Sequence, residues 1–246
     1  MKKLILAVAV MGAFAGVANA QEAATPEHTF TGNLTVATDY RFRGISQTFK
    51  EPTVQGGFDY AHSSGFYVGN WNSNVSGTSF TNGSIEMDLY AGYKFAITPD
   101  ITADVGALYY YYPGAQISGG QKYNTTELYA AATYKWFTLK YSNAVSDFFG
   151  APNSDGSDYL ELNANFEVMD KTTLGFHVGH QNVKNVANAD YTDYKVSLAR
   201  DFGFATIGLA VVGTDADKTF YSATNGAGKS KKLGETTAVL SISKAF

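Results

Sequence analysis

The sequence predicts an all-β protein, folded as a transmembrane antiparallel up-and-down β-barrel of about twelve strands. Three observations support this prediction. The 246 residues include 17 Tyr and 17 Phe, which favour strands, and only 16% are charged. Segments in which polar and apolar residues alternate with a period of two recur along the chain. The connections between these segments alternate between short and long.

The composition excludes several classes of protein. The chain is too apolar and aromatic to be disordered, with 45% hydrophobic residues. It has no Cys, which rules out a disulfide framework, a thiolate metal site, a Cys nucleophile and a lipoprotein anchor. The formal net charge of −4 argues against a general nucleic-acid binder.

The first twenty residues have the layout of a secretory signal peptide. A basic start with Lys2 and Lys3 precedes an apolar stretch at 4–17, and Ala18-Asn19-Ala20 is a small-residue cleavage site. The apolar stretch is shorter than the roughly 20 residues that a spanning helix needs. We therefore expect the protein to be exported and its chain to be divided into three parts. Residues 1–20 are the signal peptide, 21–29 a short periplasmic lead-in and 30–246 the barrel.

Period-two alternation identifies twelve strands. The clearest is 85–95, where Ile85, Met87 and Leu89 alternate with Glu86 and Asp88. No later stretch has 18 consecutive apolar residues or sustained helical periodicity. The predicted strands are 34–43, 53–62, 66–75, 85–95, 101–111, 124–136, 137–145, 159–168, 172–181, 191–200, 204–213 and 237–246.

The connections follow the pattern of outer-membrane barrels, which combine an even strand number with short periplasmic turns and longer outer loops. The short connections are 62–66, 96–100, 135–137, 168–171 and 201–204. The long ones are 44–51, 76–82, 113–122, 147–156, 182–189 and 214–235. A soluble sandwich has no reason to interleave loop lengths in this way.

Charged residues concentrate on one face of each predicted strand. The other face is apolar in strand interiors, with Lys244 near a strand end as the exception. A cation at mid-bilayer costs about 2–4 kcal/mol on a lipid-facing surface, so we expect the apolar face outside and the charged face inside. The inward set has nine acids and six bases: Asp39, Asp59, Glu86, Asp88, Asp104, Glu127, Glu161, Glu167, Asp193, Arg41, Arg43, Lys94, Lys135, Lys140 and Lys195.

Aromatic residues cluster at the predicted strand ends, which is typical of the girdles of membrane barrels. Those beside short turns are Tyr60, Phe66, Tyr93, Phe95, Tyr134, Trp136 and Phe137. Those beside long loops are Tyr40, Phe42, Tyr109 and Tyr111.

The stretch LTVATDYRFRGISQT at 34–48 resembles the opening motif of the TorF family, whose members are classed as porins. QGGFDY at 55–60, GFYVG at 65–69, EMDLYAGY at 86–93 and the terminal SKAF at 243–246 extend the resemblance over essentially the whole exported chain. The resemblance implies an outer-membrane barrel with channel function in Gram-negative bacteria. It carries over no catalytic or binding residues.

Other motifs predict little chemistry. Gly226-Ala-Gly-Lys-Ser230 ends like a phosphate loop, but Ala223 stands where that motif needs its first Gly. The segment 153–158 hints at a calcium loop, yet both key ligand positions hold apolar residues, which favours a polar turn. A Ser or Asn near the outward His180 on a neighbouring strand would be needed to mimic an outer-membrane phospholipase. We expect no catalytic residue, metal or cofactor.

The sequence predicts a narrow porin-like channel in the bacterial outer membrane that passes small hydrophilic solutes with a weak cation preference. Twelve strands lie between the filled eight-stranded and the open sixteen-stranded barrels, so a plugged structural or adhesive barrel and a lipid-hydrolysing barrel enzyme remain alternatives. Expected partners are lipid, lipopolysaccharide, small solutes and, through Phe246, the barrel-assembly machinery, although Lys244 replaces the aromatic often found two positions earlier. The predicted pore-lining residues are Asp39, Arg41, Arg43, Glu86, Asp88, Glu127, Glu161, His177, Asp193 and Lys195.

Overall fold

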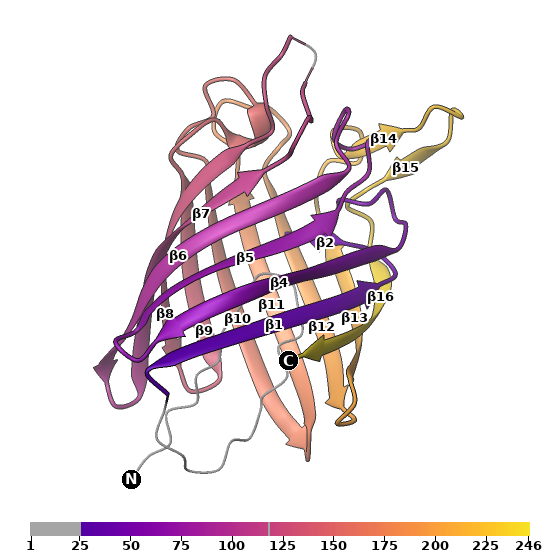
Figure 1. The fold of residues 1–246 in the computed structure, drawn as a ribbon. Helices are drawn as coiled ribbons and strands as arrows, with labels where there is room; N and C mark the ends of the chain where they lie inside the picture. The colour runs from indigo at the N-terminus through magenta and orange to yellow at the C-terminus, as the bar shows by residue number, and fades with distance from the viewer. Residues whose placement is uncertain (1–25, 118) are drawn as a thin grey trace.

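Twelve antiparallel strands close into a barrel (Figure 1). The computed structural model describes residues 26–117 and 119–246, so the expected signal peptide lies outside the described residues. The barrel strands are β1 (His28–Ala37), β4 (Thr53–His62), β5 (Phe66–Asn74), β6 (Ile85–Thr98), β7 (Ile101–Tyr111), β8 (Thr125–Tyr134), β9 (Phe137–Ala144), β10 (Asp158–Met169), β11 (Thr172–Asn182), β12 (Tyr191–Asp201), β13 (Thr206–Thr214) and β16 (Thr237–Ala245). The predicted all-β fold and strand number are confirmed.

The barrel closes at its first strand, which pairs with both β4 and β16. His28 opposes His62 at one end of the β1–β4 ladder, and Ala37 opposes Thr53 at the other. Beyond β16, Phe246 exchanges two backbone hydrogen bonds with Gly32, of 2.7 and 3.0 Å. Every barrel strand therefore has two neighbours, and the barrel wall has no free edge to pair with another chain.

Short and long connections lie at opposite ends of the barrel, as Figure 1 shows. We call these the turn end and the loop end. At the turn end the β8–β9 connection is tight, since Tyr134 opposes Phe137 and Lys135 adopts a left-handed φ of 53°. At the loop end the last connection carries a small hairpin, β14 (Ser222–Thr224) and β15 (Ser230–Lys232). The predicted interleaving of loop lengths is confirmed.

The outer surface of the barrel is apolar. Leu128, Leu160, Leu209 and Leu240 are each about half exposed, and many Val, Ile and Phe side chains share this surface. Strand alternation places these residues outside and their polar neighbours inside. An apolar surface that surrounds a barrel in this way is suited to lipid rather than water.

Aromatic rings gather at both ends of this surface. Trp136 and Phe137 both contact Phe166 at the turn end, where Phe30 packs on Tyr60. Tyr109 and Tyr111 stack near the loop end. The barrel therefore has the two aromatic bands that the sequence predicts, apart from two residues discussed below.

Helix is nearly absent from the described part of the chain, where the one helical element is a single 3₁₀ turn, η1 (Phe148–Gly150). Within residues 26–117 and 119–246, no helix combines the length and apolar character needed to cross a membrane.

The first strand ends earlier than the alternation predicts. β1 stops at Ala37, and residues 38–52 leave the wall before β4 begins. Tyr40 and Phe42, which we expected in the outer aromatic band, lie inside the barrel instead. Tyr40 is buried, and Phe42 packs edge-on against Tyr110 at a centroid distance of 5.6 Å. The prediction for these two residues is therefore wrong.

Candidate functional site in the barrel lumen

Residues 38–52 fold across the loop end of the barrel and fill much of it. We call them the plug segment. Two short strands, β2 (Arg41–Phe42) and β3 (Ile45–Ser46), form a hairpin whose turn has left-handed φ angles at Arg43 (45°) and Gly44 (80°). A Cβ on Gly44 would lie 2.4 Å from a Thr214 methyl carbon and 2.8 Å from the Cβ of Asp193. The turn tip therefore touches the wall at β12 and β13 so closely that glycine is required.

Asp39 and Arg41 shape this segment instead of lining the strand wall, which corrects their predicted position on the first strand. The Asp39 carboxylate accepts hydrogen bonds from Arg41 Nε (2.6 Å), Ser46 Oγ (2.6 Å) and Thr48 Oγ1 (2.9 Å). Arg41 Nη1 also donates to the Leu233 carbonyl at 2.7 Å. This carboxylate therefore fixes the fold of the plug segment, and Arg41 ties it to the last long connection.

Arg43 spans the lumen to the wall opposite the plug segment. Its Nη2 donates to Glu127 Oε2 on β8 at 2.7 Å, and its Nη1 donates to Gln181 Oε1 on β11 at 2.7 Å. The guanidinium also lies 4.2 Å from the ring centre of Tyr159 on β10 and 4.7 Å from that of Phe42. Like Asp39 and Arg41, Arg43 was expected on the first strand. It reaches its charge partner from the turn of the plug segment instead.

The carboxylates of β6 and β8 form a buried acidic group beside this arginine. Glu86 Oε1 accepts a hydrogen bond of 2.8 Å from the Tyr40 hydroxyl, so a plug residue contacts it as well. Asp88 Oδ1 has no hydrogen-bond partner among the residues that the structure describes. Tyr110 donates to Glu127 at 3.2 Å. The inward direction predicted for all three carboxylates agrees with the structure, while their role in conduction stays a prediction.

The loop end of the lumen is closed to water at the level of Arg43 and the buried acidic group. The relative exposure is 0% for Glu86 and Tyr110, 2% for Glu127 and 8% for Arg43. Aromatic rings complete the packing, because Tyr40 lies 5.2 Å from Trp71 and Phe42 lies 5.5 Å from Phe149, measured between ring centres. In this conformation the plug segment leaves no passage along these side chains for a hydrated solute.

A second polar cluster surrounds His177 nearer the middle of the barrel. His177 Nε2 lies 2.9 Å from Asp193 Oδ1 and 3.0 Å from the Tyr159 hydroxyl, which donates to Asp193 Oδ2 at 2.6 Å. On the other side, Nδ1 lies 2.8 Å from Asn163 Oδ1 and 3.6 Å from Glu161. Both ring nitrogens therefore lie within hydrogen-bond distance of oxygen atoms. The structure brings the predicted residues Glu161, His177 and Asp193 together.

Lysines and tyrosines line the lumen toward the turn end. Lys140 lies directly across from Glu161 on the neighbouring strand, and Lys195 lies across from His177. Both lysines are partly exposed. Lys94 pairs with Asp104 at 3.7 Å, and the Tyr67 hydroxyl donates to the same carboxylate at 2.7 Å. This half of the lumen is polar and more open than the loop end.

The inward tyrosines lie flat against the wall because the neighbouring strand offers glycine. A Cβ on Gly92, Gly106 or Gly179 would overlap a tyrosine hydroxyl of the next strand. The rings of Tyr67, Tyr129 and Tyr159 occupy these positions, respectively. The glycines thus let large polar rings cover the wall of the lumen.

Sequence reasoning missed these tyrosines and Gln181 as lumen residues. The signal was present in part, since Tyr90 and Gly92 are two residues apart on one strand face, and Gly175 and Gly179 share one face of another strand. However, which glycine faces which tyrosine depends on the register between strands, and periodicity within one strand does not determine that register.

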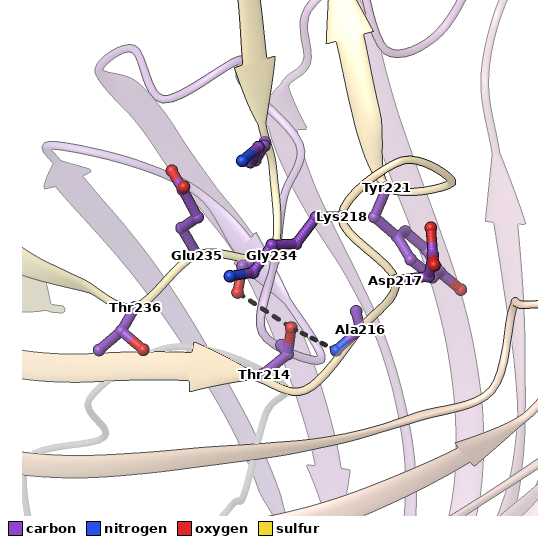
Figure 2. Close-up of a pocket in the computed structure, with 9 residues that line it drawn as sticks. Thr214, Ala216, Asp217, Lys218, Tyr221, Gly234, Glu235 and Thr236 are labelled. Atoms are coloured by element: carbon purple, nitrogen blue, oxygen red, sulfur yellow. Dashed lines mark hydrogen bonds between the residues drawn. The ribbon is translucent and has the colours of Figure 1, made fainter.

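A small pocket lies outside the lumen, in the last long connection (Figure 2). Thr214 Oγ1 joins its two sides, because it donates to the Gly234 carbonyl at 2.9 Å and accepts from the Ala216 amide at 3.2 Å. Asp217, Lys218 and Glu235 give the rim charges of both signs. With this mixture of charges and no aimed buried donor or acceptor, the pocket serves the packing of the loop.

The outward His180 has no catalytic surroundings. Its Nδ1 lies 3.1 Å from Thr192 Oγ1 on the neighbouring strand, where a hydrolase of the kind considered above would need Ser or Asn. Among the described residues, its recorded polar contact is this threonine. This contact therefore does not supply the Ser or Asn that such a hydrolase would need beside His180.

Known structures share this barrel. The KdgM porin aligns with a TM-score of 0.57 and 9% identity over 88% of this chain and 99% of that chain. The NanC porin aligns with a TM-score of 0.54 and 10% identity over 86% and 98%. At these identities the likeness establishes the fold alone. No curated protein matches the sequence.

The sequence match to a family covers the described barrel and the residues before it. Residues 20–246 match the family described as "Bacterial protein of unknown function (Gcw_chp)". The comparisons do not confirm the resemblance to the TorF family. The match spans nearly the whole chain, and the protein is therefore a member of the bacterial Gcw_chp family.

Proposed function

We propose that the protein is a narrow, non-enzymatic channel of the bacterial outer membrane that passes small hydrophilic solutes. The closed barrel combines an apolar outside with an inside that carries charges and tyrosine hydroxyls. A barrel that only needs to fill its own core has no use for such a polar interior. The plug segment sets the narrowest point of the channel.

The observation that carries this proposal is the contact of Arg43 with the far wall. The Arg43 side chain donates hydrogen bonds to Glu127 and Gln181 and also stacks on the ring of Tyr159. Withdrawal of this single side chain removes contacts to three strands at once. Conduction therefore depends on how often the Arg43 contacts break.

The acid–base balance supports a weak cation preference. Asp59, Glu86, Asp88, Glu161 and Asp193 form no ion pair with Lys or Arg in the described residues. Among the lumen bases, Lys140 and Lys195 lack a carboxylate within ion-pair distance in the same part of the chain. Charges that line a pore set its selectivity, and acids predominate here. We therefore propose cationic or zwitterionic solutes. A KdgM porin is known in complex with oligogalacturonate, an anionic ligand that this balance does not favour.

Single-channel recording in planar bilayers tests the proposal. We expect small, infrequent openings for the wild-type protein and larger or more frequent ones for Arg43→Gln. Lys122→Gln is the matched control, because it also removes one positive charge at the loop end but Lys122 is exposed and lies outside the plug segment. In a salt gradient the reversal potential should have the sign of a cation-preferring pore.

Two results would overturn these proposals separately. An anion-selective reversal potential would contradict the charge argument alone. A folded protein that conducts neither as wild type nor as Arg43→Gln would favour a plugged structural barrel, the second candidate that the burial of Glu86 and Tyr110 supports.

The proposed location implies three further partners. Lipid and lipopolysaccharide would contact the apolar belt, and the barrel-assembly machinery would read the C-terminal Phe246, whose side chain is 71% exposed.

A further inference from the structure

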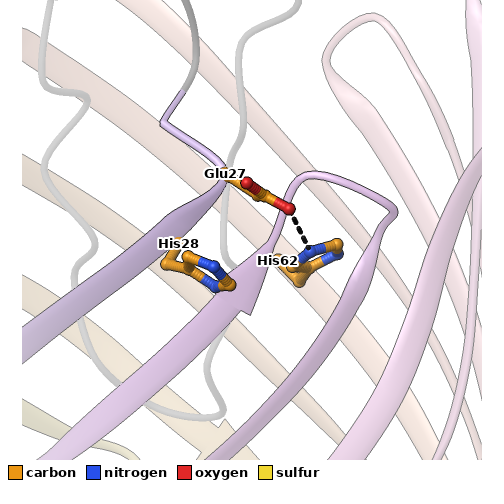
Figure 3. A group of neighbouring side chains, drawn as sticks. All are labelled: Glu27, His28 and His62. Atoms are coloured by element: carbon orange, nitrogen blue, oxygen red, sulfur yellow. Dashed lines mark ion pairs between the residues drawn. The ribbon is translucent and has the colours of Figure 1, made fainter.

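A cluster of two histidines and one carboxylate lies at the turn end, where β1 begins and β4 ends (Figure 3). His28 and His62 are directly opposed across the β1–β4 ladder, and Glu27 precedes His28. One possible ligand atom from each side chain lies within 4.8 Å of the other two. His62 Nε2 is 3.5 Å from Glu27 Oε1. This cluster has no part in the proposed channel.

Both rings form their hydrogen bonds through Nδ1. His28 Nδ1 lies 2.9 Å from the Tyr60 hydroxyl, and His62 Nδ1 lies 2.8 Å from Ser64 Oγ and accepts from the Ser64 amide at 3.1 Å. When His28 Nδ1 carries its hydrogen and donates to the Tyr60 oxygen, Nε2 of that ring keeps a free lone pair. Metal binding at His62 Nε2 would move the hydrogen of that ring to Nδ1, which would then donate to Ser64 Oγ instead of accepting from the amide. Outer hydrogen bonds of this kind orient the histidine ligands of metal sites.

Two imidazole nitrogens and one carboxylate oxygen form a ligand set suited to zinc and related divalent transition metals. Ligand atoms around one zinc ion lie roughly 3.3 Å apart, so the cluster needs a modest contraction. Glu27 can supply it, because its side chain is 72% exposed and extends from the start of the strand. Water would complete the coordination.

We propose that Glu27, His28 and His62 bind one divalent transition metal ion of the zinc class. The ion would link the first residues of β1 to the β4–β5 turn. The backbone already joins these segments, since the Ser63 amide donates to the Glu27 carbonyl at 2.9 Å. Bound metal therefore fastens the start of the barrel.

Isothermal titration calorimetry of the detergent-purified protein with ZnCl₂ tests the proposal, provided that no histidine tag is present. We expect one zinc ion per chain for the wild type and binding weakened about tenfold or more by His28→Ala or His62→Ala. Zinc should also raise the thermal unfolding temperature of the wild type but not of either variant. His180→Ala is the matched control, because His180 is likewise exposed on the outer face.

Milder variants keep the test valid if an alanine variant fails to fold. Tyr60→Phe and Ser64→Ala remove the oxygens that hold Nδ1, and each should weaken zinc binding about tenfold while circular dichroism stays unchanged. Wild-type affinity in folded His28→Ala and His62→Ala would overturn the proposal. So would loss of zinc binding in His177→Ala, which would place the metal in the lumen.

Discussion

At the scale of the residue, the lumen depends on close contacts between glycine and tyrosine. The ideal Cβ position of Gly179 is 2.0 Å from the Tyr159 hydroxyl, which is held by Asp193 and His177. A methyl group there displaces the hydroxyl and breaks both contacts.

We therefore expect Gly179→Ala to lower the free energy of unfolding by about 1–3 kcal/mol, the usual cost of overpacking. Urea unfolding of the protein in lipid vesicles measures this. Gly226→Ala is the control, because nothing lies within 4 Å of its ideal Cβ. Equal stability of the two variants would contradict this account of the wall.

Single residues were predictable where strand alternation governs them. Glu86, Glu127 and Asp193 face inward as expected, because each lies within a barrel strand. Asp39 and Arg43 were misplaced because the alternation continues past Ala37, where the chain leaves the wall. Asp39 recruits Ser46 and Thr48, and these contacts override the local pattern.

At the scale of the element, two ion pairs fasten the plug segment to the last long connection. Lys231 pairs with Glu51 at 2.5 Å, and Lys50 pairs with Glu235 at 2.8 Å. The lysines lower the pKa of Glu51 and of Glu235 below the ordinary value for a carboxyl group. A carboxyl group with a lowered pKa stabilises the docked arrangement at pH values above its ordinary pKa. This contribution is lost as the pH falls through the lowered pKa.

Acidification should therefore loosen the contact between the two connections. The chain has no cysteine, so a spin label on Ala227→Cys, at the tip of the β14–β15 hairpin, reports this region alone. We expect the mobility of the label to rise as the pH falls below about 4. In Glu51→Gln/Glu235→Gln it should be high at every pH. A pH response that persists in the double variant would exclude these carboxyl groups as its cause.

The number and order of the strands could be predicted from the sequence. A barrel wall with one face in lipid and the other in the lumen imposes a strict alternation of apolar and polar residues. The plug segment did not follow, since its contacts join residues far apart, such as Arg41 and Leu233. The cluster of Glu27, His28 and His62 could not be predicted for the same reason. His28 and His62 become neighbours only through the register of β1 with β4.

At the scale of the whole molecule, the orientation of the barrel wall can be tested on one strand. Leu162 and Asn165 both belong to β10, but Leu162 faces out and Asn165 faces the lumen beside Gly175. We expect Leu162→Arg to cost about 2–4 kcal/mol in vesicles, because the charge enters lipid. Asn165→Arg should leave the unfolding free energy nearly unchanged. Similar costs for both variants would contradict the assignment of inside and outside.

The reach of Arg43 across the lumen also has a mechanical consequence. A ring of strands flattens easily when nothing crosses it, whereas a side chain that joins the plug segment to the opposite wall acts as a strut. The side chain that narrows the lumen therefore also stiffens its cross-section. Lateral pressure from the surrounding lipid should then influence the opening of this barrel more strongly once the strut is removed.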